Sequence, residues 1–336
     1  TLFTLIVTMA LVTTLAMPPM LRWSLARLPT SPEEAERLKR IAFEGRGYVP
    51  QLERLLAAVD QSPSGVLAAR FVGLLAGAWG MPTTLVPLTP RSGAARVGQR
   101  PEAAAVEAAM ADAVLPNEDT ARQPGSLQTE AAPRAKNTQA TIAEVSKRGF
   151  GILWIGAEPG ADASGLIHST VADVASGFDG HLALVFARGE LARNPLATEL
   201  RVLVPVSGAK YSRRAAEVAL ALAQACHASV TALYVSEAPP RWVWRKNLKL
   251  TLALRSGEDA ILKEMSDLAN QYGAQLRPLA RTGNDPAEVV VQELERGHYN
   301  LVILGVTQRP GETLALGTTA RVVLARSAQS VLLHAS

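Results

Sequence analysis

Short apolar runs alternate with helix-like segments in the second part of the chain. The runs are four to six residues long, the length of a buried strand, and they lie at 202–206, 230–235, 301–304 and 330–334. After the first run, apolar residues recur every three or four positions, as on one face of a helix: Ala215, Val218, Ala219, Leu222 and Cys226. The pattern predicts strands connected by amphipathic helices.

Two further helices have recognisable ends. Ser256 is the expected N-cap of a helix that ends at Gly273. Asp285 is the expected cap of the next helix, with Pro286 in its first turn and Glu288 completing a capping box. The residues expected to face the core are Ile261, Met265, Leu268 and Tyr272 in the first helix, and Ala287, Val290, Val291 and Leu294 in the second. Strands that alternate with such helices predict an α/β fold whose parallel sheet is covered on both faces.

The first part of the chain repeats this order. Residues 55–88 align with 202–235 at an offset of 147, and the apolar run that ends at Gly156 matches the run that ends at Gly305 at an offset of 149. These matches indicate a tandem duplication. The first copy keeps its first strand, its first helix and its last strand (182–187), whereas 89–140 reads as a long insert with a flexible connector. We expect one domain at 51–192 and a second at 193–336.

The N-terminus differs in kind from the rest. Residues 1–21 contain no charged side chain, and a stretch of this length is about what a helix needs to cross a bilayer. Residues 1–23 are therefore expected to form a transmembrane helix, followed by a juxtamembrane linker at 24–50. Because Arg22, Arg27, Lys39 and Arg40 follow the apolar segment, the positive-inside rule places the residues after about 23 in the cytoplasm. The alternative is a buried hydrophobic helix of a soluble protein.

Composition narrows the classes of site. The chain of 336 residues has a net charge of +4, its single cysteine excludes an internal disulfide, and its five histidines lack metal-ligand spacing, so we expect no metal. Its arginines and lysines are dispersed except at 241–249, and we expect no nucleic-acid partner. That basic stretch is interpreted as a solvated loop or helix start, or else as a contact with a membrane surface or an acidic partner.

Two motifs carry a family resemblance. The stretch GNDPAEVVVQELERGHYNLVILG (283–305) and the glycine loop after it resemble the universal stress protein domain. The apolar segment 3–23, followed by two such domains, resembles the C-terminal end of bacterial monovalent cation:proton antiporters. The resemblance implies two tandem universal stress protein-like domains, each a doubly wound, five-stranded parallel sheet of order 3-2-1-4-5, after one N-terminal transmembrane helix. In that order a ligand is expected where the strand order reverses.

The resemblance also implies which residues bind a ligand. In nucleotide-binding members an Asp ends the first strand and contacts the nucleoside, and the glycine loop holds phosphate. The first copy keeps Asp60, but Glu158 and Asp162 in its loop would repel phosphate, whereas in the second copy Ser207 replaces the Asp and Gln308 replaces a loop glycine. We therefore expect weak ATP or AMP binding at the second copy and none at the first. The candidate nucleotide residues are Ser207, Gly305, Val306, Gly311, Gly317, Thr318, Thr319 and Asp60.

Two functions follow from these patterns. The first is a cytoplasmic regulatory or scaffolding tail of a Na⁺ or K⁺:proton antiporter in the inner membrane, joined to a membrane-embedded transporter region and forming a homodimer through it. Within one chain the two domains are then expected to form a pseudo-dimer, in which the apolar edge strands 182–187 and 330–334 pair. The alternative is a free-standing tandem universal stress protein that binds ATP or AMP. No catalytic motif is present in the sequence, so we expect no enzyme activity.

Overall fold

The computed structural model describes residues 47–88, 101–113, 126–129, 138–156, 169–236, 248–307 and 316–336, and the single positions Val7, Met9 and Met17. Apart from these three positions, the predicted transmembrane helix at 1–23 lies outside the described residues, as do most of the linker at 24–50 and Glu158, Asp162, Gln308 and Gly311. Within the described ranges, no helix combines enough length with enough apolar character to span a bilayer. Residues 47–336 form one compact unit.

Ten strands of the described residues form a single sheet in the order β3-β2-β1-β4-β5-β10-β9-β6-β7-β8. Its first half contains β1 (Leu55–Val59), β2 (Thr83–Pro87), β3 (Leu127–Thr129), β4 (Ile152–Gly156) and β5 (His181–Phe186). Its second half contains β6 (Arg201–Val206), β7 (Ser229–Ser236), β8 (Leu276–Thr282), β9 (Leu301–Val306) and β10 (Ser330–Ala335). Each half is parallel and has the expected order 3-2-1-4-5, so the sequence predicted the α/β fold correctly.

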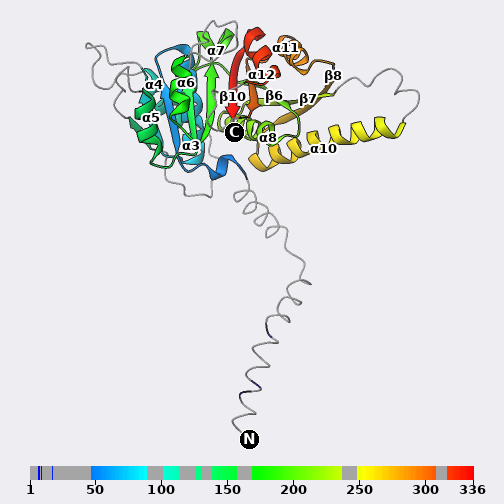
Figure 1. Cartoon of the computed structure of the whole chain (residues 1–336), viewed down its shortest axis with the longest axis horizontal. Coiled ribbons are helices and arrows are strands. Elements are labelled where there is room, and N and C mark those ends of the chain that lie inside the picture. Colours follow the sequence, from blue (N-terminus) through cyan, green and yellow to red (C-terminus); the bar gives the residue numbers. More distant parts are fainter. Residues whose placement is uncertain are drawn as a thin grey trace. The chain divides into compact units, whose positions relative to one another are not determined.

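The two halves meet along β5 and β10. These strands pair antiparallel, with a register that runs from Phe186 opposite Val331 to Leu182 opposite Ala335. Figure 1 shows β10 in the middle of this unit, between the elements of the two halves. Both strands are apolar and buried, so each covers an edge that would otherwise expose unpaired backbone groups. The strand pairing that the sequence led us to expect is thus confirmed.

Helices cover both faces of the sheet. On one face, a hydrophobic cluster joins the sheet to α5 (Thr138–Ser146), α6 (Ser169–Ser176), α11 (Pro286–Arg296) and α12 (Thr318–Arg326). This cluster includes Leu153 and Ile155, whereas Trp154 points to the opposite face, where it contacts Phe71 of α3 (Pro63–Trp79). The remaining helices are α4 (Pro101–Asp112), α7 (Gly189–Arg193), α8 (Lys210–Cys226) and α10 (Leu248–Tyr272), and a short 3₁₀ helix, η1, spans Val49–Gln51.

The expected insert at 89–140 is partly structural. It contains α4, which packs against α3, and β3, the outermost strand of the first half. An added Cβ would lie 2.5 Å from the carbonyl oxygen of Val106 at Gly73, and 2.5 Å from that of Met110 at Gly77. The two helices therefore touch through glycine and alanine, which give little hydrophobic periodicity in the sequence.

One predicted helix boundary and one predicted capping contact need correction. The helix expected from Ser256 begins at Leu248, although it ends as expected before Gly273, whose φ is +64°. Asp285 does cap α11 by accepting a hydrogen bond from the Ala287 amide at 2.9 Å. Glu288 does not complete a capping box, because its carboxylate binds Arg326 of α12.

Candidate functional site

The strand order of the second half reverses between β6 and β9, and these two strands separate early. They pair only at Val202 with Leu301 and at Leu203 with Val302 in the described structure. In the first half, β1 and β4 stay paired up to Ala58, which is the counterpart of Pro205 at the offset of 147. A crevice therefore opens at the carboxyl ends of β6 and β9, the place where parallel α/β sheets bind ligands.

Pro205 accounts for this early separation. The carbonyl of Arg201 accepts a hydrogen bond from the Asn300 amide at 3.1 Å, so it faces β9. Backbone groups alternate sides along a strand, and position 205 therefore faces β9 as well. Proline has no N–H to donate there, so the β6–β9 ladder ends before it.

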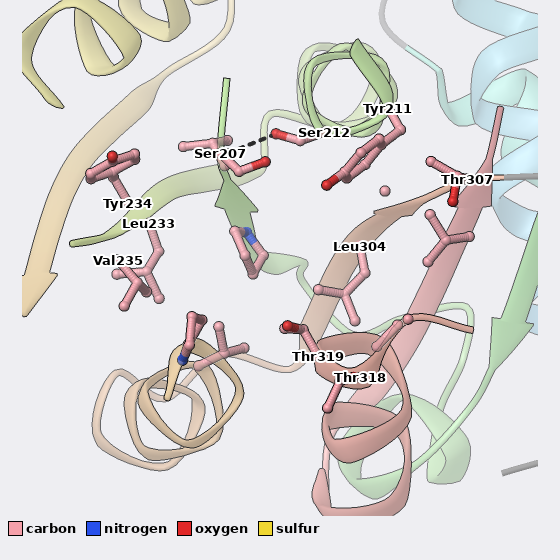
Figure 2. Close-up of a pocket in the computed structure, with 18 residues that line it drawn as sticks. Ser207, Tyr211, Ser212, Leu233, Tyr234, Val235, Leu304, Thr307, Thr318 and Thr319 are labelled. Carbon is pink, nitrogen blue, oxygen red and sulfur yellow. Dashed lines mark hydrogen bonds between the residues drawn. The ribbon is translucent and has the colours of Figure 1, made fainter. Parts of the chain in front are cut away.

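Gly305 brings the start of α8 close to β9 at the same place. A Cβ on this glycine would lie 2.2 Å from the carbonyl oxygen of Tyr211. The absence of a side chain allows this contact, and the Ser207 amide then donates to Ser212 Oγ at 3.0 Å. The loop between β6 and α8 is thus fixed over the crevice, and Figure 2 shows the Tyr211 ring at the rim of the resulting pocket.

The crevice forms a pocket of about 370 Å³. It lies between the carboxyl ends of β6, β7 and β9 and the first turns of α8, α11 and α12 (Figure 2). Six of the eight candidate residues line it, namely Ser207, Gly305, Val306, Gly317, Thr318 and Thr319. Of the other two, Gly311 lies outside the described residues, and Asp60 lies at the end of β1 in the first half.

The first turn of α12 offers the pocket backbone donors. Gly317 is the N-cap, with φ −61° and ψ 161°, and the helix start has no side-chain cap hydrogen bond. Thr318 is the first helical residue. The amides at the start of a helix have no intrahelical acceptor and carry the positive end of the helix dipole, so they favour an anion.

The walls of the pocket carry no formal charge among the described residues that line it. They combine the hydroxyl groups of serine, threonine and tyrosine with the apolar side chains of Leu233, Val235 and Leu304. The nearby carboxylate of Asp285 is occupied in capping α11. Among the described lining residues, an anion at α12 therefore meets hydrogen-bond donors and no carboxylate.

Asp60 has a local role in the first half. Its carboxylate accepts a hydrogen bond from the Ser62 amide at 3.0 Å and another from the Ser62 hydroxyl. A Cβ at Gly65 would lie 2.6 Å from its Oδ1, so this carboxylate packs directly on the start of α3. Asp60 thus lies apart from the other candidate residues, and its carboxylate is hydrogen-bonded within a local turn.

Several lining residues were missed by the sequence analysis. They are Pro205, Tyr211, Ser212, Leu233, Tyr234, Val235, Pro286, Val290, Leu304, Thr307 and Ala320. The repeat carried a usable signal for two of them, because the offset of 147 places Tyr211 on Ser64 and Pro205 on Ala58.

Comparison with known proteins identifies the domain that contains this pocket. Residues 200–334 match the universal stress protein family. This span includes every residue that lines the pocket. A curated universal stress protein of Methanocaldococcus jannaschii, MJ0531, is 28% identical over 131 residues, which cover 37% of this chain and 75% of the relative. The resemblance seen in the sequence is thus confirmed for the second half.

Solved structures extend the likeness. A universal stress protein from Archaeoglobus fulgidus matches with a TM-score of 0.51 and 16% identity, over 84% of this chain and 98% of its own, which shows a shared fold across both halves. A protein of the family from Arabidopsis thaliana, solved with AMP bound, matches 40% of this chain and 91% of its own at 18% identity, with a TM-score of 0.31. None of these likenesses bears on the transporter region, which stays a prediction.

Proposed function

We propose that this chain binds an adenine nucleotide, AMP or ATP, in the pocket between β6 and β9. The observation that carries the proposal is the first turn of α12, whose amides have no side-chain cap and open into a pocket at the strand-order reversal, where the described lining residues carry no formal charge. The proposal is for binding without catalysis.

The lining residues suggest how such a ligand would lie. The phosphate would accept hydrogen bonds from the amides at the start of α12 and from the hydroxyls of Thr318 and Thr319. The base would pack on the apolar residues at the end of β7, Leu233 and Val235, with Tyr234 beside them. The ribose would then lie at the end of β6, next to Ser207.

Ser207 limits the expected affinity. A carboxylate at this position would give the ribose a charge-assisted hydrogen bond worth about 1.5 to 3 kcal/mol, which the serine hydroxyl does not match. That difference corresponds to roughly a tenfold to hundredfold loss of affinity. We therefore expect dissociation constants in the high micromolar range or weaker.

Titration calorimetry with AMP and ATP tests this proposal. Ser207→Asp is expected to tighten binding about tenfold. The control is Ser229→Asp, which places the same charge on an exposed residue at the opposite end of β7 and is expected to leave affinity unchanged. No binding at millimolar nucleotide by any of the three proteins would refute the proposal, and submicromolar affinity of the unmodified chain would refute the role assigned to Ser207.

We also propose that residues 1–23 anchor the chain in the inner membrane, as the end of a cation:proton antiporter whose cytoplasmic tail is the unit described above. The absence of charge from 1–21, followed by arginines and lysines, supports this proposal. The full chain should then partition with membranes and require detergent, whereas a shortened chain that begins at Glu44 should not. Equal solubility of both would rule out the anchor.

A further inference from the structure

Arg188 reaches from the first half of the sheet into the second. It follows β5 and forms the N-cap position of α7, and its Nη1 donates hydrogen bonds to the carbonyl oxygens of Leu324 and Ser327, the latter at 2.8 Å. Its backbone amide donates to Ser330 Oγ at 2.9 Å, and this hydroxyl donates back to the Arg188 carbonyl at 3.0 Å. All four hydrogen bonds join segments more than 130 residues apart in sequence.

The two hydrogen bonds of the Arg188 guanidinium lie at the C-terminal end of α12. The last carbonyls of a helix have no intrahelical donor and carry the negative end of the dipole, so a guanidinium there satisfies them and stabilises the helix end. Burial lowers the pKa of Arg188 below its usual value. An arginine nevertheless remains charged in a protein, so the contact keeps its cation.

The other end of the same helix lines the pocket. With nine residues, α12 is about 13 Å long, so a shift or tilt at Ser327 is transmitted to the amides that follow Gly317. A second contact ties the helix to its own half, because Arg326 binds the carboxylate of Glu288 in α11. Arg188 is thus a hydrogen-bonding contact by which the first half holds this helix.

We propose that Arg188 is a positioning residue of the pocket, and that through α12 the first half of the sheet sets where the anion-binding amides lie. The inference rests on the proposed nucleotide site. It gives the first half, whose own Asp60 is bound in a turn, a part in ligand binding.

The test compares Arg188→Met with Arg70→Met in the full chain. Arg70 is a matched control, because its Nη1 also donates to two carbonyl oxygens, those of Pro195 and Thr198 at 2.8 and 2.9 Å, and it is almost fully buried. Both changes are expected to lower the melting temperature. Only Arg188→Met is expected to weaken AMP binding, by about fivefold, which is the lower end of usual coupling between sites.

Hydrogen exchange of the α12 amides, measured without ligand, separates failure of this inference from failure of the nucleotide site. Faster exchange of the Arg321 amide, which donates to the Gly317 carbonyl at 3.0 Å and so reports on the start of α12, in Arg188→Met than in Arg70→Met supports the positioning role even if no nucleotide binds. Unchanged exchange and unchanged affinity would overturn it. Arg188→Lys, which keeps the charge and loses the forked donor, is expected to fold if the methionine variant does not, and to show the same two effects at smaller size.

Discussion

The hydroxyl of Tyr48 lies 3.0 Å from Nε2 of His334, although 286 positions separate the two residues in sequence. Tyr48 precedes β1, and His334 lies in β10, where its ring stacks at 6.0 Å on that of His181 in β5. The Tyr48 ring contacts both imidazoles edge-on, and the guanidinium of Arg214 lies 5.5 Å from its centre. Tyr48, His181 and His334 therefore form a cluster of rings where β5 and β10 join the two halves.

This cluster predicts a loss of stability in mild acid. Burial, the charge of His181 and the charge of Arg214 lower the pKa of His334 to about 3. The unfolded chain binds a proton at this residue below a pH of about 6.5, and the folded chain does not, so the free energy of unfolding falls as the pH drops from about 6.5 towards 3. Between pH 7 and 5 the loss from this group is about 2 kcal/mol.

Urea unfolding at the two pH values measures this loss. His334→Gln keeps a partner for Tyr48 and removes the titrating ring, so its stability is expected to depend less on pH. His227→Asn is the control, because His227 is exposed, and asparagine tolerates its φ of +54°. If His334→Gln retained the full pH dependence, the assignment to His334 would be wrong.

Two glycines of the pocket should respond differently to alanine. At Gly305 the new Cβ would lie 2.2 Å from the Tyr211 carbonyl oxygen, so Gly305→Ala is expected to destabilise the protein by about 1 to 3 kcal/mol. At Gly317 no described atom lies within 4 Å of the new Cβ and φ is −61°. Alanine is a poorer N-cap than glycine but lowers the entropy of the unfolded chain, so the free energy of unfolding should change by less than about 1 kcal/mol. Gly317→Ala is nevertheless expected to weaken nucleotide binding, because the methyl group enters the space next to the α12 amides. Denaturant melts and calorimetry measure the two effects separately.

The contact between α3 and α4 gives a second matched pair. Gly73→Ala places a Cβ 2.5 Å from the Val106 carbonyl oxygen and should destabilise the protein by about 1 to 3 kcal/mol. Gly257 lies in α10, and no atom of the described residues lies within 4 Å of a Cβ added there, so Gly257→Ala should stabilise the protein by up to about 1 kcal/mol through helix propensity. Thermal melts of both variants test the packing, and a stabilising Gly73→Ala would show that α4 does not touch α3 as described.

Asp60 should matter for stability and not for the ligand. Asp60→Ala removes the acceptor of two hydrogen bonds from Ser62 and is expected to lower the free energy of unfolding by about 1 kcal/mol. AMP affinity should stay the same, since the pocket lies in the other half. A clear drop in AMP affinity of Asp60→Ala, measured well below the melting temperature, would show that Asp60 takes part in ligand binding.

Much of the fold was predictable because its strands are continuous apolar runs with few alternatives. The pairing of β5 with β10 followed from two apolar edges that had to be covered. The start of α10 was missed because Ser256 followed by Gly257 is typical of a turn just before a helix. In the structure this glycine lies inside a helix of 25 residues. The Ala-rich α4 leaves little periodic signal in the sequence, because its contacts with Gly73 depend on small side chains.

The candidate site was predictable only where the family motif reaches. The glycines and threonines of the loop were found from the motif, and the pocket brings six of the eight candidates together. Tyr211 and Pro205 were missed, because their effects depend on which neighbour a backbone group faces and on the approach of α8 to β9. Such contacts are set by three-dimensional packing and leave no period in the sequence.

The position of β10 in the middle of the sheet has a consequence for synthesis on the ribosome. The strand that pairs with β5 lies about 140 residues further along the chain. At translation rates of roughly 5 to 20 residues per second, the apolar edge of β5 therefore stays unpaired for about 7 to 28 s. During that interval the available partner is the β5 edge of a neighbouring nascent chain. A chain that stops at residue 192 is therefore expected to associate through β5, and size-exclusion chromatography would detect the dimer, whereas a strictly monomeric product would show that the edge is protected in another way.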